Sequence, residues 1–461
     1  MFSYYDLTQA AGRVAAGLLA GRQDLGEARV AFLVPPACAH VVIARGIWRA
    51  GGVAVPLAVS HPPAELEHVI RDSGASIVVA SGRQGDALEA MASAQGARFI
   101  RTPDLIATDE DPAPAIETAP AGRAMIVYTS GTTGKPKGVV TTHANMAAQI
   151  ASLLQAWEWT ASDRALLVLP LHHVHGIINV LGCALAAGAS CEILPQFDTE
   201  PAWERLASGD VTVFSAVPTI YHRLIASWEG AAPSLRRSRS EGCRHVRLMM
   251  SGSAALPRRT MERWREITGH SLLERYGMTE LGMVLSNPLH GERRPGSVGQ
   301  PLPGVEVRLA DGEIQVRGPG VFLEYWGRPE ETAASFHDGW FRTGDIAVLE
   351  DGGYRLLGRS SVDIIKTGGY KVSALEIEDV IRDYPGVVDC AVVAVPDAEW
   401  GERIGVAVEL APGVAVSLDE LQQWTARTLA PYKTPRLLRT FAALPRNALG
   451  KVLKAEIAAL M

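Results

Sequence analysis

A short stretch rich in glycine, hydroxyl and lysine side chains, residues 128–138, places the strongest constraint on the fold of this chain. It reads Tyr-Thr-Ser-Gly-Thr-Thr-Gly-Lys-Pro-Lys-Gly, with apolar residues before it at 125–127 and after it at 139–140. This pattern predicts a loop between two buried strands. Glycines let backbone N–H groups approach an anion closely, and the four hydroxyls and two lysines add donors. We therefore predict a polyphosphate-binding loop, although its spacing differs from the Walker pattern. A plain surface turn would explain the glycines but not the hydroxyls, the lysines and the flanking strands together.

The first part of the chain alternates between apolar strands and amphipathic helices. Apolar runs at 30–34, 53–57 and 76–80 predict strands, and the segments 39–50 and 65–73 between them predict helices. Strands that alternate with helices form a parallel sheet with helices on both faces. A length of 461 residues allows two or more domains. The predicted fold class is therefore α/β.

Composition and charge indicate a soluble globular protein and argue against some other classes. The content of 47% hydrophobic and 20% charged residues is ordinary for a soluble globular protein, and a net charge of −6 argues against general nucleic-acid binding. The five cysteines are scattered and odd in number, which predicts reduced thiols. The start of the chain lacks the pattern of a signal peptide, and no apolar stretch is long enough to span a bilayer. We expect a cytoplasmic monomer or homodimer.

The loop at 128–138 resembles the phosphate loop of the adenylate-forming enzymes, which include acyl-CoA synthetases, luciferases and adenylation domains of peptide synthetases. Further segments resemble later signatures of that family in the expected order: 274–280, 343–345, 358–359 and 445–451. The resemblance covers nearly the whole chain. It implies a large N-terminal domain of wound α/β sheets, residues 1–359, which binds ATP and the acid. It also implies a smaller, mobile α+β C-terminal domain, residues 360–461, which carries a catalytic lysine.

The resemblance implies how the phosphates of ATP are bound. They would contact residues of the loop, namely Thr129, Ser130, Gly131, Thr132, Thr133, Gly134, Lys135 and Lys137. Thr279 would donate a hydrogen bond to a phosphate oxygen. Glu280 would hold Mg²⁺, an ion that commonly binds few protein carboxylates together with substrate phosphates.

The nucleoside part of ATP would bind further along the chain. Small residues at the carboxyl end of a strand let a flat ring lie against the backbone, and the family's adenine position corresponds to Ser251, Gly252 and Ser253. The resemblance implies that Tyr276 stacks on adenine, that Asp345 accepts both ribose hydroxyls, and that Arg359 steadies the same end of the nucleotide.

The C-terminal domain would supply the remaining groups. Lys451 resembles the family's catalytic lysine, which contacts the carboxylate and the α-phosphate during adenylate formation. After the domain rotates, the turn at Gly368 and Gly369 would lie beside the pantetheine arm of coenzyme A. The chain departs from the family at the pivot, where Ser361 replaces the common Asp or Lys. Serine can still act as a hinge, because a hinge needs only to absorb a backbone change.

Three histidines cluster within 172–175 and allow two interpretations. Their spacing at a strand end does not bring all three to one ion, and no acidic or sulfur ligand stands near, so a metal site is disfavoured. The resemblance instead implies that this segment lines the acyl pocket. His173 would help to gate the route of the thiol, and His175 matches a histidine of the malonyl-CoA synthetase branch. Packing accounts for His172.

The residues of the acid pocket point to a short diacid. Arg223 lies in a pocket-lining segment, and Arg293 follows the 279–280 pair at close range. A guanidinium in a pocket is costly unless it meets an anion. A diacid offers one carboxylate to the phosphate and one to an arginine, and these segments resemble malonyl-CoA synthetases. The alternative is that Arg223 pairs with a glutamate outside the pocket.

The resulting hypothesis is an AMP-forming ligase that uses ATP, Mg²⁺ and coenzyme A. It would convert malonate, or methylmalonate, to malonyl-AMP with release of pyrophosphate and then to malonyl-CoA and AMP, in fatty acid metabolism. Alternatives are a ligase for a short, medium or aromatic monocarboxylate, a nucleotide-binding relative without turnover, and a module that loads a carrier protein. Five arginines within 236–247 form either a solvated loop, which we favour, or a patch that attracts the phosphates of coenzyme A.

Overall fold

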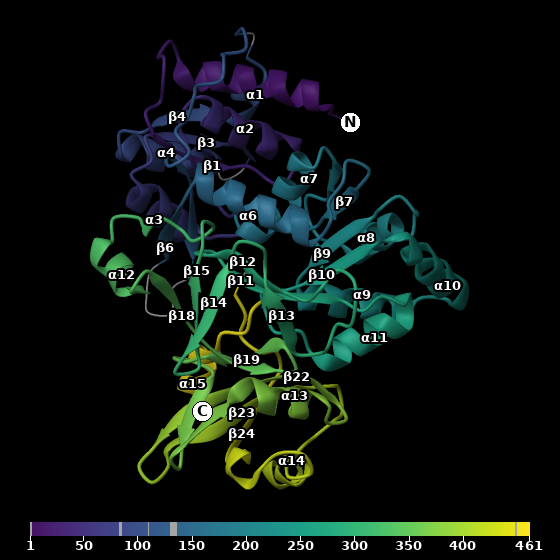
Figure 1. Ribbon diagram of the computed structural model, residues 1–461. Helices are drawn as coiled ribbons and strands as arrows, with labels where there is room; N and C mark the ends of the chain where they lie inside the picture. The colour runs from purple at the N-terminus through teal and green to yellow at the C-terminus, as the bar shows by residue number, and fades with distance from the viewer. Residues whose placement is uncertain (1, 83–84, 109, 130–135, 448–449) are drawn as a thin grey trace.

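The computed structural model describes residues 2–82, 85–108, 110–129, 136–447 and 450–461. This described part is a mixed α/β structure with three sheets. It has a large N-terminal domain and a smaller C-terminal domain, which confirms the predicted fold class. In Figure 1 the C-terminal sheet and its helices lie at the end of the molecule opposite to α1. The boundary at 359–360 and the mobility of the small domain stay predictions.

The first sheet contains the parallel strands predicted from the start of the sequence. Its strand order is β16-β6-β5-β2-β1-β3-β4, and β1 to β4 pair in parallel. The strands are β1 (Arg29–Leu33), β2 (Val53–Pro56), β3 (Ile77–Ala80), β4 (Arg98–Arg101), β5 (Arg123–Thr129), β6 (Lys137–Thr142) and β16 (Glu324–Tyr325). The helices of this region are α1 (Tyr4–Leu19), α2 (Cys38–Arg49), α3 (Pro63–Ser73), α4 (Gly85–Ala94), α5 (Thr102–Ile106) and α6 (His143–Ala156).

The predicted phosphate loop connects β5 and β6, which pair antiparallel up to Thr129 and Lys137. Both strands are largely buried, because the apolar residues at 125–127 and 139–140 pack in the core. The connection between two buried strands agrees with the sequence prediction, but β6 pairs antiparallel with both β5 and β16, whereas the pairs among β1 to β5 are parallel. Helix α3 contacts both sides of the connection. Asp72 accepts the hydroxyl of Tyr128 at 2.8 Å, and Nε2 of His68 lies 3.0 Å from the carbonyl of Pro136.

The second sheet is parallel at one end and antiparallel at the other. Its order is β14-β15-β18-β19-β13-β12-β11-β10-β9-β7-β8, and β17 pairs with β18. The parallel strands are β7 (Arg164–Leu167), β8 (Ser190–Ile193), β9 (Val213–Ala216), β10 (Leu248–Ser251) and β11 (Leu273–Met278). The antiparallel part contains β12 (Gly282–Ser286), β13 (Ser297–Pro301), β14 (Glu306–Ala310), β15 (Glu313–Arg317), β17 (Phe336–His337), β18 (Trp340–Glu350) and β19 (Gly353–Arg359). Parallel pairing of β9, β10 and β11 brings their carboxyl ends to one edge.

Helices and one π-helix accompany the second sheet. They are the π-helix η2 (His175–Gly182), α7 (Cys183–Ala186), α8 (Thr199–Leu206), α9 (Pro218–Gly230), α10 (Pro233–Gly242), the 3₁₀-helix η3 (Cys243–His245), α11 (Arg258–Thr268) and α12 (Pro329–Ala334). A buried aromatic cluster fixes α8, α9 and α11 together. The ring of Trp264 lies 5.5 Å from Trp203 and 5.0 Å from Tyr221, between ring centroids. This cluster fixes α9, which carries Arg223.

The third sheet belongs to the C-terminal domain. Its order is β21-β20-β23-β22, with β24 paired to β23. The elements are β20 (Ile364–Thr367), β21 (Tyr370–Ser373), α13 (Ala374–Arg382), β22 (Val387–Asp397), β23 (Gly401–Leu410), α14 (Leu418–Thr425), the 3₁₀-helix η4 (Pro431–Lys433), β24 (Leu437–Phe441) and α15 (Lys454–Leu460). Serine side chains at 373 and 417 cap the N-termini of α13 and α14.

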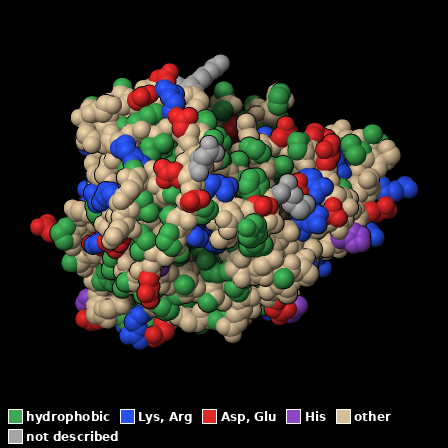
Figure 2. Space-filling model, turned by 90° about the horizontal axis from the view of Figure 1, so that it is seen from above, with side chains coloured by type: hydrophobic (Ala, Val, Ile, Leu, Met, Phe, Trp, Pro, Cys, Tyr) green, Lys and Arg blue, Asp and Glu red, His purple; other side chains and the backbone are tan. Residues whose placement is uncertain are grey.

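Surface charges of both signs are mixed (Figure 2), and the cysteines are free thiols, as expected from the composition. On the face seen in Figure 2, basic and acidic side chains lie interspersed. Each of the five cysteines, all in the described ranges, is a free thiol. Of the helices in the described part of the chain, none combines the length and apolar character needed to cross a membrane.

The aromatic cluster yields a stability prediction. Replacing Trp264 by alanine should lower the free energy of unfolding by about 3–5 kcal/mol, because it leaves a large cavity between three helices. Urea unfolding followed by circular dichroism measures the effect. Tyr5→Ala, which removes an aromatic ring that is 71% exposed, should change the same quantity by less than about 0.5 kcal/mol. Equal losses in the two variants would contradict the role of the cluster.

Candidate active site

A cavity of about 2120 Å³ opens beyond the carboxyl ends of β9, β10 and β11 and extends to the C-terminal domain. Ligands of parallel sheets bind in this position. Its walls include ten of the residues predicted from the sequence, namely Thr129, Lys137, His173, His175, Arg223, Ser253, Thr279, Glu280, Arg359 and Lys451. Segments that are far apart in the sequence therefore converge on one space.

Three of the six residues predicted to bind the nucleoside are joined by hydrogen bonds. Asp345 and Arg359 face each other in the β18–β19 pair, and Nε of Arg359 lies 2.9 Å from Oδ1 of Asp345. The hydroxyl of Tyr276 donates to Oδ2 of the same carboxylate at 2.7 Å. Burial opposes the charge of Arg359, but Asp345 raises its pKa overall. The Asp345 carboxylate is thus held in one orientation beside the cavity.

The segment predicted to contact adenine ends β10 and has little free space. Ser251 and Gly252 are buried, and a Cβ added to Gly252 would lie 2.2 Å from Nη1 of Arg275. A larger residue at this position would require the Arg275 guanidinium to move. Ser253 has a left-handed backbone with φ of 68°, and its hydroxyl lies 3.1 Å from Nδ1 of His175.

At the phosphate end of the cavity, Lys137 has an anionic neighbour in this structure. Its ammonium forms an ion pair with Glu331 of α12 and lies 5.4 Å from the ring centroid of Tyr325. Thr129 ends the facing strand. The other predicted phosphate contacts lie outside the described residues: Ser130, Gly131, Thr132, Thr133, Gly134 and Lys135.

Glu280 fits the predicted metal-binding role chemically. The carboxylate is buried, and its Oε1 accepts the hydroxyl of Tyr325 at 2.9 Å. Burial raises the pKa of Glu280, so a nearby cation would stabilise its ionised form. Within the described ranges, no three His, Cys, Asp or Glu side chains gather into a possible metal site. A lone carboxylate suits an ion that completes its coordination with phosphates and water.

The histidines on the cavity wall are held in a neutral state. Burial lowers the pKa of His173 to about 4 and lowers the pKa of His175 well below its ordinary value. Nε2 of His175 lies 2.8 Å from the hydroxyl of Ser215. The rings of His172 and His173 are 4.3 Å apart between centroids. Neutral imidazoles can accept or donate a hydrogen bond without repelling a cation.

The two arginines predicted to bind the acid lie in different places. Arg223 is on the cavity wall, with its guanidinium carbon 4.8 Å from the ring centroid of Phe197, and no acidic partner is found for it among the described residues. Arg293 is not on the wall. Its guanidinium donates to the carbonyls of Ser271 at 2.7 Å, Leu289 at 2.6 Å and Pro288 at 3.1 Å. The structure therefore corrects the prediction for Arg293, because main-chain carbonyls already occupy its donors.

Most of the arginine-rich segment 236–247 also has local partners. Arg236 donates to the carbonyl of Ala231, Arg239 pairs with Glu200, and Arg247 binds both carboxylate oxygens of Asp163. Most of the segment lies in α10 and η3 rather than in a loop, and it ends just before β10.

Lys451 and the glycine turn of the small domain are placed differently with respect to the cavity. Lys451 lies on the wall, while Gly368 and Gly369 do not. These glycines form the β20–β21 turn, with φ of 55° and 84°, conformations that favour glycine. Although the Lys451 side chain reaches solvent, the atoms around it desolvate the amino group and, with Arg359, lower its pKa.

Arg275 is a buried cation that the sequence interpretation missed, and it is not among the residues of the cavity wall. Its side chain is 2% exposed, and within the described part of the chain Nε, Nη1 and Nη2 have no hydrogen-bond partner. Burial lowers its pKa, while Tyr221 opposes the shift. Burial is the main cause of the lowered pKa of His175, and the Arg275 guanidinium lowers it further. The sequence signal was a charged pair, Glu274 and Arg275, at the start of β11, beside the tyrosine to which a role was assigned.

Comparisons with known proteins agree with this arrangement. The family described as AMP-binding enzyme matches residues 1–326, and the AMP-binding enzyme C-terminal domain matches 376–451. A mitochondrial malonate–CoA ligase of Mus musculus is 46% identical over 94% of this chain and 82% of its own length. The malonate–CoA ligase of Arabidopsis thaliana is 43% identical over 95% of this chain and 78% of its own length.

Solved structures agree as well. ATP-bound MatB from Rhodopseudomonas palustris has a TM-score of 0.92 at 35% identity, covering 99% of this chain and 93% of that protein. A malonyl-CoA ligase in a ternary product complex with methylmalonyl-CoA and AMP has a TM-score of 0.69 at 39% identity, covering 96% and 94%. With family models matched in both parts of the chain and relatives at more than 40% identity, the chain belongs to the AMP-binding enzyme family.

Proposed function

We propose that this protein is a malonate–CoA ligase that forms malonyl-AMP and pyrophosphate from malonate and ATP, and then malonyl-CoA and AMP. Relatives named as malonate–CoA ligases match most of the chain. The structural observation that carries the proposal is the buried guanidinium of Arg275, which lacks any hydrogen-bond acceptor.

A buried guanidinium without an acceptor is unfavourable, because its charge has lost water and gained nothing in exchange. A second carboxylate on the substrate would supply the missing acceptor and could bind two guanidinium nitrogens at once. Arg275 is not itself on the cavity wall, but its guanidinium lies against Gly252, which precedes Ser253 of the wall. Ser253 lies within hydrogen-bond distance of His175. A monocarboxylate has no group to offer there. We therefore assign the distal carboxylate of malonate to Arg275, and Arg223 adds positive charge at the same wall.

The first half of the reaction needs two oxyanions held together. A carboxylate is activated by attack on the α-phosphate of ATP, so the protein must align the reactants and offset the charge that develops. Lys451 would contact the carboxylate and the α-phosphate, while Thr279 and the loop from Thr129 to Lys137 would bind the other phosphates. Glu280 would hold Mg²⁺, which when bound neutralises phosphate charge.

The second half needs a different arrangement of the small domain. In this structure Lys451 lines the cavity and the Gly368–Gly369 turn does not. The chain also superposes better on the ATP-bound relative than on the product complex, although the latter shares more sequence. Both observations support an adenylate-forming arrangement here. Rotation at Ser361 would then withdraw Lys451 and bring the glycine turn to the thiol of coenzyme A.

Location, assembly and metabolic role stay predictions. We propose a cytoplasmic monomer or homodimer that supplies malonyl groups to fatty acid metabolism. Mammalian relatives are named as mitochondrial, so cell fractionation and light scattering on the purified protein are the direct tests.

The decisive experiment compares acids. We expect malonate to give the highest kcat/KM for pyrophosphate release, with formation of malonyl-CoA and AMP only when coenzyme A is present. The kcat/KM for methylmalonate should be lower by a factor that corresponds to about 1–3 kcal/mol, because that is the free energy that one methyl group controls. The panel should include butyrate and benzoate. If the kcat/KM for butyrate or benzoate exceeds that for malonate, the assignment of a diacid substrate is wrong.

Arg275→Met should lower kcat/KM for malonate by about a hundredfold relative to butyrate, because losing one partner of a buried charged pair costs about 2–5 kcal/mol. The matched control is Arg293→Met, whose guanidinium binds carbonyls away from the cavity. It should reduce stability but leave the malonate-to-butyrate ratio unchanged. An unchanged ratio in Arg275→Met would remove this residue from the acid site.

The lowered pKa of Lys451 gives a pH prediction. Lysine carries its charge below its pKa, so a pKa below the ordinary 10.5 moves the loss of charge to lower pH. At saturating malonate, adenylate formation should therefore fall on the alkaline side before pH 10.5. Lys451→Arg should be slower but should lack this alkaline fall, since arginine stays charged. Pyrophosphate release measured from neutral pH upward tests this, and identical pH profiles would contradict it.

A further inference from the structure

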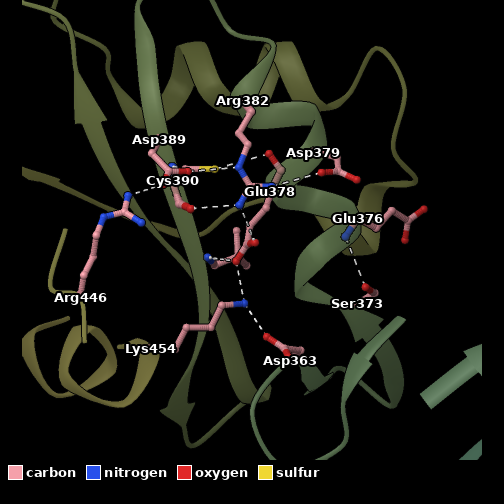
Figure 3. Close-up of polar contacts among 11 residues, drawn as sticks. Asp363, Ser373, Glu376, Glu378, Asp379, Arg382, Asp389, Cys390, Arg446 and Lys454 are labelled. Carbon is pink, nitrogen blue, oxygen red and sulfur yellow. Dashed lines mark hydrogen bonds and ion pairs between the residues drawn. The ribbon is translucent and has the colours of Figure 1, made fainter. Parts of the chain in front are cut away.

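A chain of alternating charges crosses the C-terminal domain (Figure 3). It begins at Asp363, just before β20, whose Oδ1 lies 2.5 Å from Nζ of Lys454 at the start of α15. The same ammonium lies 2.6 Å from Oε1 of Glu378 on α13. Glu378 also accepts the backbone N–H of Val392 at 2.9 Å, so its carboxylate is fixed to the sheet.

The chain continues from α13 to the loop that carries Lys451. Nη2 of Arg382 lies 3.0 Å from Glu378, and its Nε lies 3.2 Å from Asp389. Asp389 also accepts Nη2 of Arg446 at 2.5 Å, and Arg446 donates to the carbonyl of Gly450 at 2.9 Å. The final contact is thus made immediately before Lys451. Lys454 stands three residues after it, so the chain reaches both flanks of Lys451.

Burial makes these contacts energetically important. The side chains of Glu378, Lys454 and Asp363 are 3%, 13% and 16% exposed. Burial opposes the charge of Lys454, but Glu378 and Asp363 keep its pKa above the ordinary value. Removing one member of such a set leaves its neighbours charged and desolvated. The set is therefore a strong constraint on how its segments lie relative to one another.

The other end of the chain contacts the predicted pivot of the domain. Oδ2 of Asp363 accepts the backbone N–H of Arg359 at 2.9 Å, and the N–H of Asp363 donates to the Arg359 carbonyl at 2.7 Å. Ser361 lies between these two residues. A backbone rotation at Ser361 must break these contacts, because they span it. The carboxylate of Asp363 would then keep only Lys454.

We propose that Lys454 is a positioning residue that couples the backbone at Ser361 to the placement of Lys451. In the present arrangement Asp363 is bound on both sides, by Arg359 and by Lys454, and the loop of Lys451 is anchored at both flanks. When the backbone turns at Ser361, the contacts between Asp363 and Arg359 break, and the anchoring of the Lys451 loop changes at the same time. The inference rests on the proposed function, since it assumes that Lys451 acts in adenylate formation and leaves for thioester formation.

The test measures the two half-reactions separately in the full-length chain. Adenylate formation is followed as malonate-dependent exchange of pyrophosphate into ATP, and thioester formation is followed from prepared malonyl-AMP and coenzyme A. Lys454→Met should slow adenylate formation by between about tenfold and about a hundredfold, the range expected when a reacting group is misplaced by about 1 Å. Thioester formation should change by less than about threefold, since Lys451 is not used in that step.

Lys433 provides a matched control within the same domain. Its ammonium lies 2.6 Å from Glu376 and its side chain is 18% exposed, but the pair contacts neither the pivot nor the loop of Lys451. Lys433→Met should leave the ratio of the two half-reaction rates unchanged. If it changes that ratio as Lys454→Met does, or if Lys454→Met slows both half-reactions equally, the proposal is overturned and the effect is one of stability.

A double-mutant cycle tests the coupling to the pivot. Asp363→Asn should also slow adenylate formation selectively, and Asp363→Asn with Lys454→Met should be no more than about twofold worse than the stronger single variant. Losses that multiply would contradict coupling through this pair. Lys454→Arg, which keeps the charge, should recover part of the rate. Failure of the wild-type chain to exchange pyrophosphate with any acid would instead refute the proposed function.

Discussion

The proposed site depends on positive charge that the acidic groups of the protein balance only in part. Among the described residues no acceptor is found for the Arg275 guanidinium, Arg223 lies against the ring of Phe197, and Lys451 is desolvated near Arg359. Such groups repel one another and favour anionic ligands. The second sheet holds Arg275, the aromatic cluster fixes the helix that carries Arg223, and the small domain carries Lys451. The anionic substrates complete an electrostatic arrangement that the protein alone leaves unbalanced.

The sequence predicted the fold well because strands and helices follow from local patterns, while the roles of the nucleotide-site residues stay predictions. Apolar runs predicted β1, β2 and β3 to within one residue at each end, and Tyr276, Asp345 and Arg359 lie in motifs that could be read directly. The sequence did not show that the carboxylate of Asp345 would join the other two side chains in one hydrogen-bonded group. That depends on the register of β18 and β19, which pair through a bulge.

The acid pocket was harder to predict, because residue type alone does not tell where a side chain points. Adjacent residues of a strand face opposite sides of the sheet, so Tyr276 reaches Asp345 while Arg275 lies beside His175 and Tyr221. Arg293 lies in a loop, where no periodicity indicates the direction of its side chain. Its guanidinium donates hydrogen bonds to backbone carbonyls. The ion chain of the small domain was also invisible in sequence, since its members come from α13, α15, β22 and the loops near them.

The missing side chain at Gly252 has a wider consequence. A methyl group there would overlap the guanidinium of Arg275, so the wall predicted to support adenine and the group assigned to the acid are in direct contact. A side chain added at this position would therefore displace the Arg275 guanidinium, so a change on the side predicted for adenine would also alter the group assigned to the acid. Redesign toward larger or uncharged acids would have to treat both sides of Gly252 as a single unit.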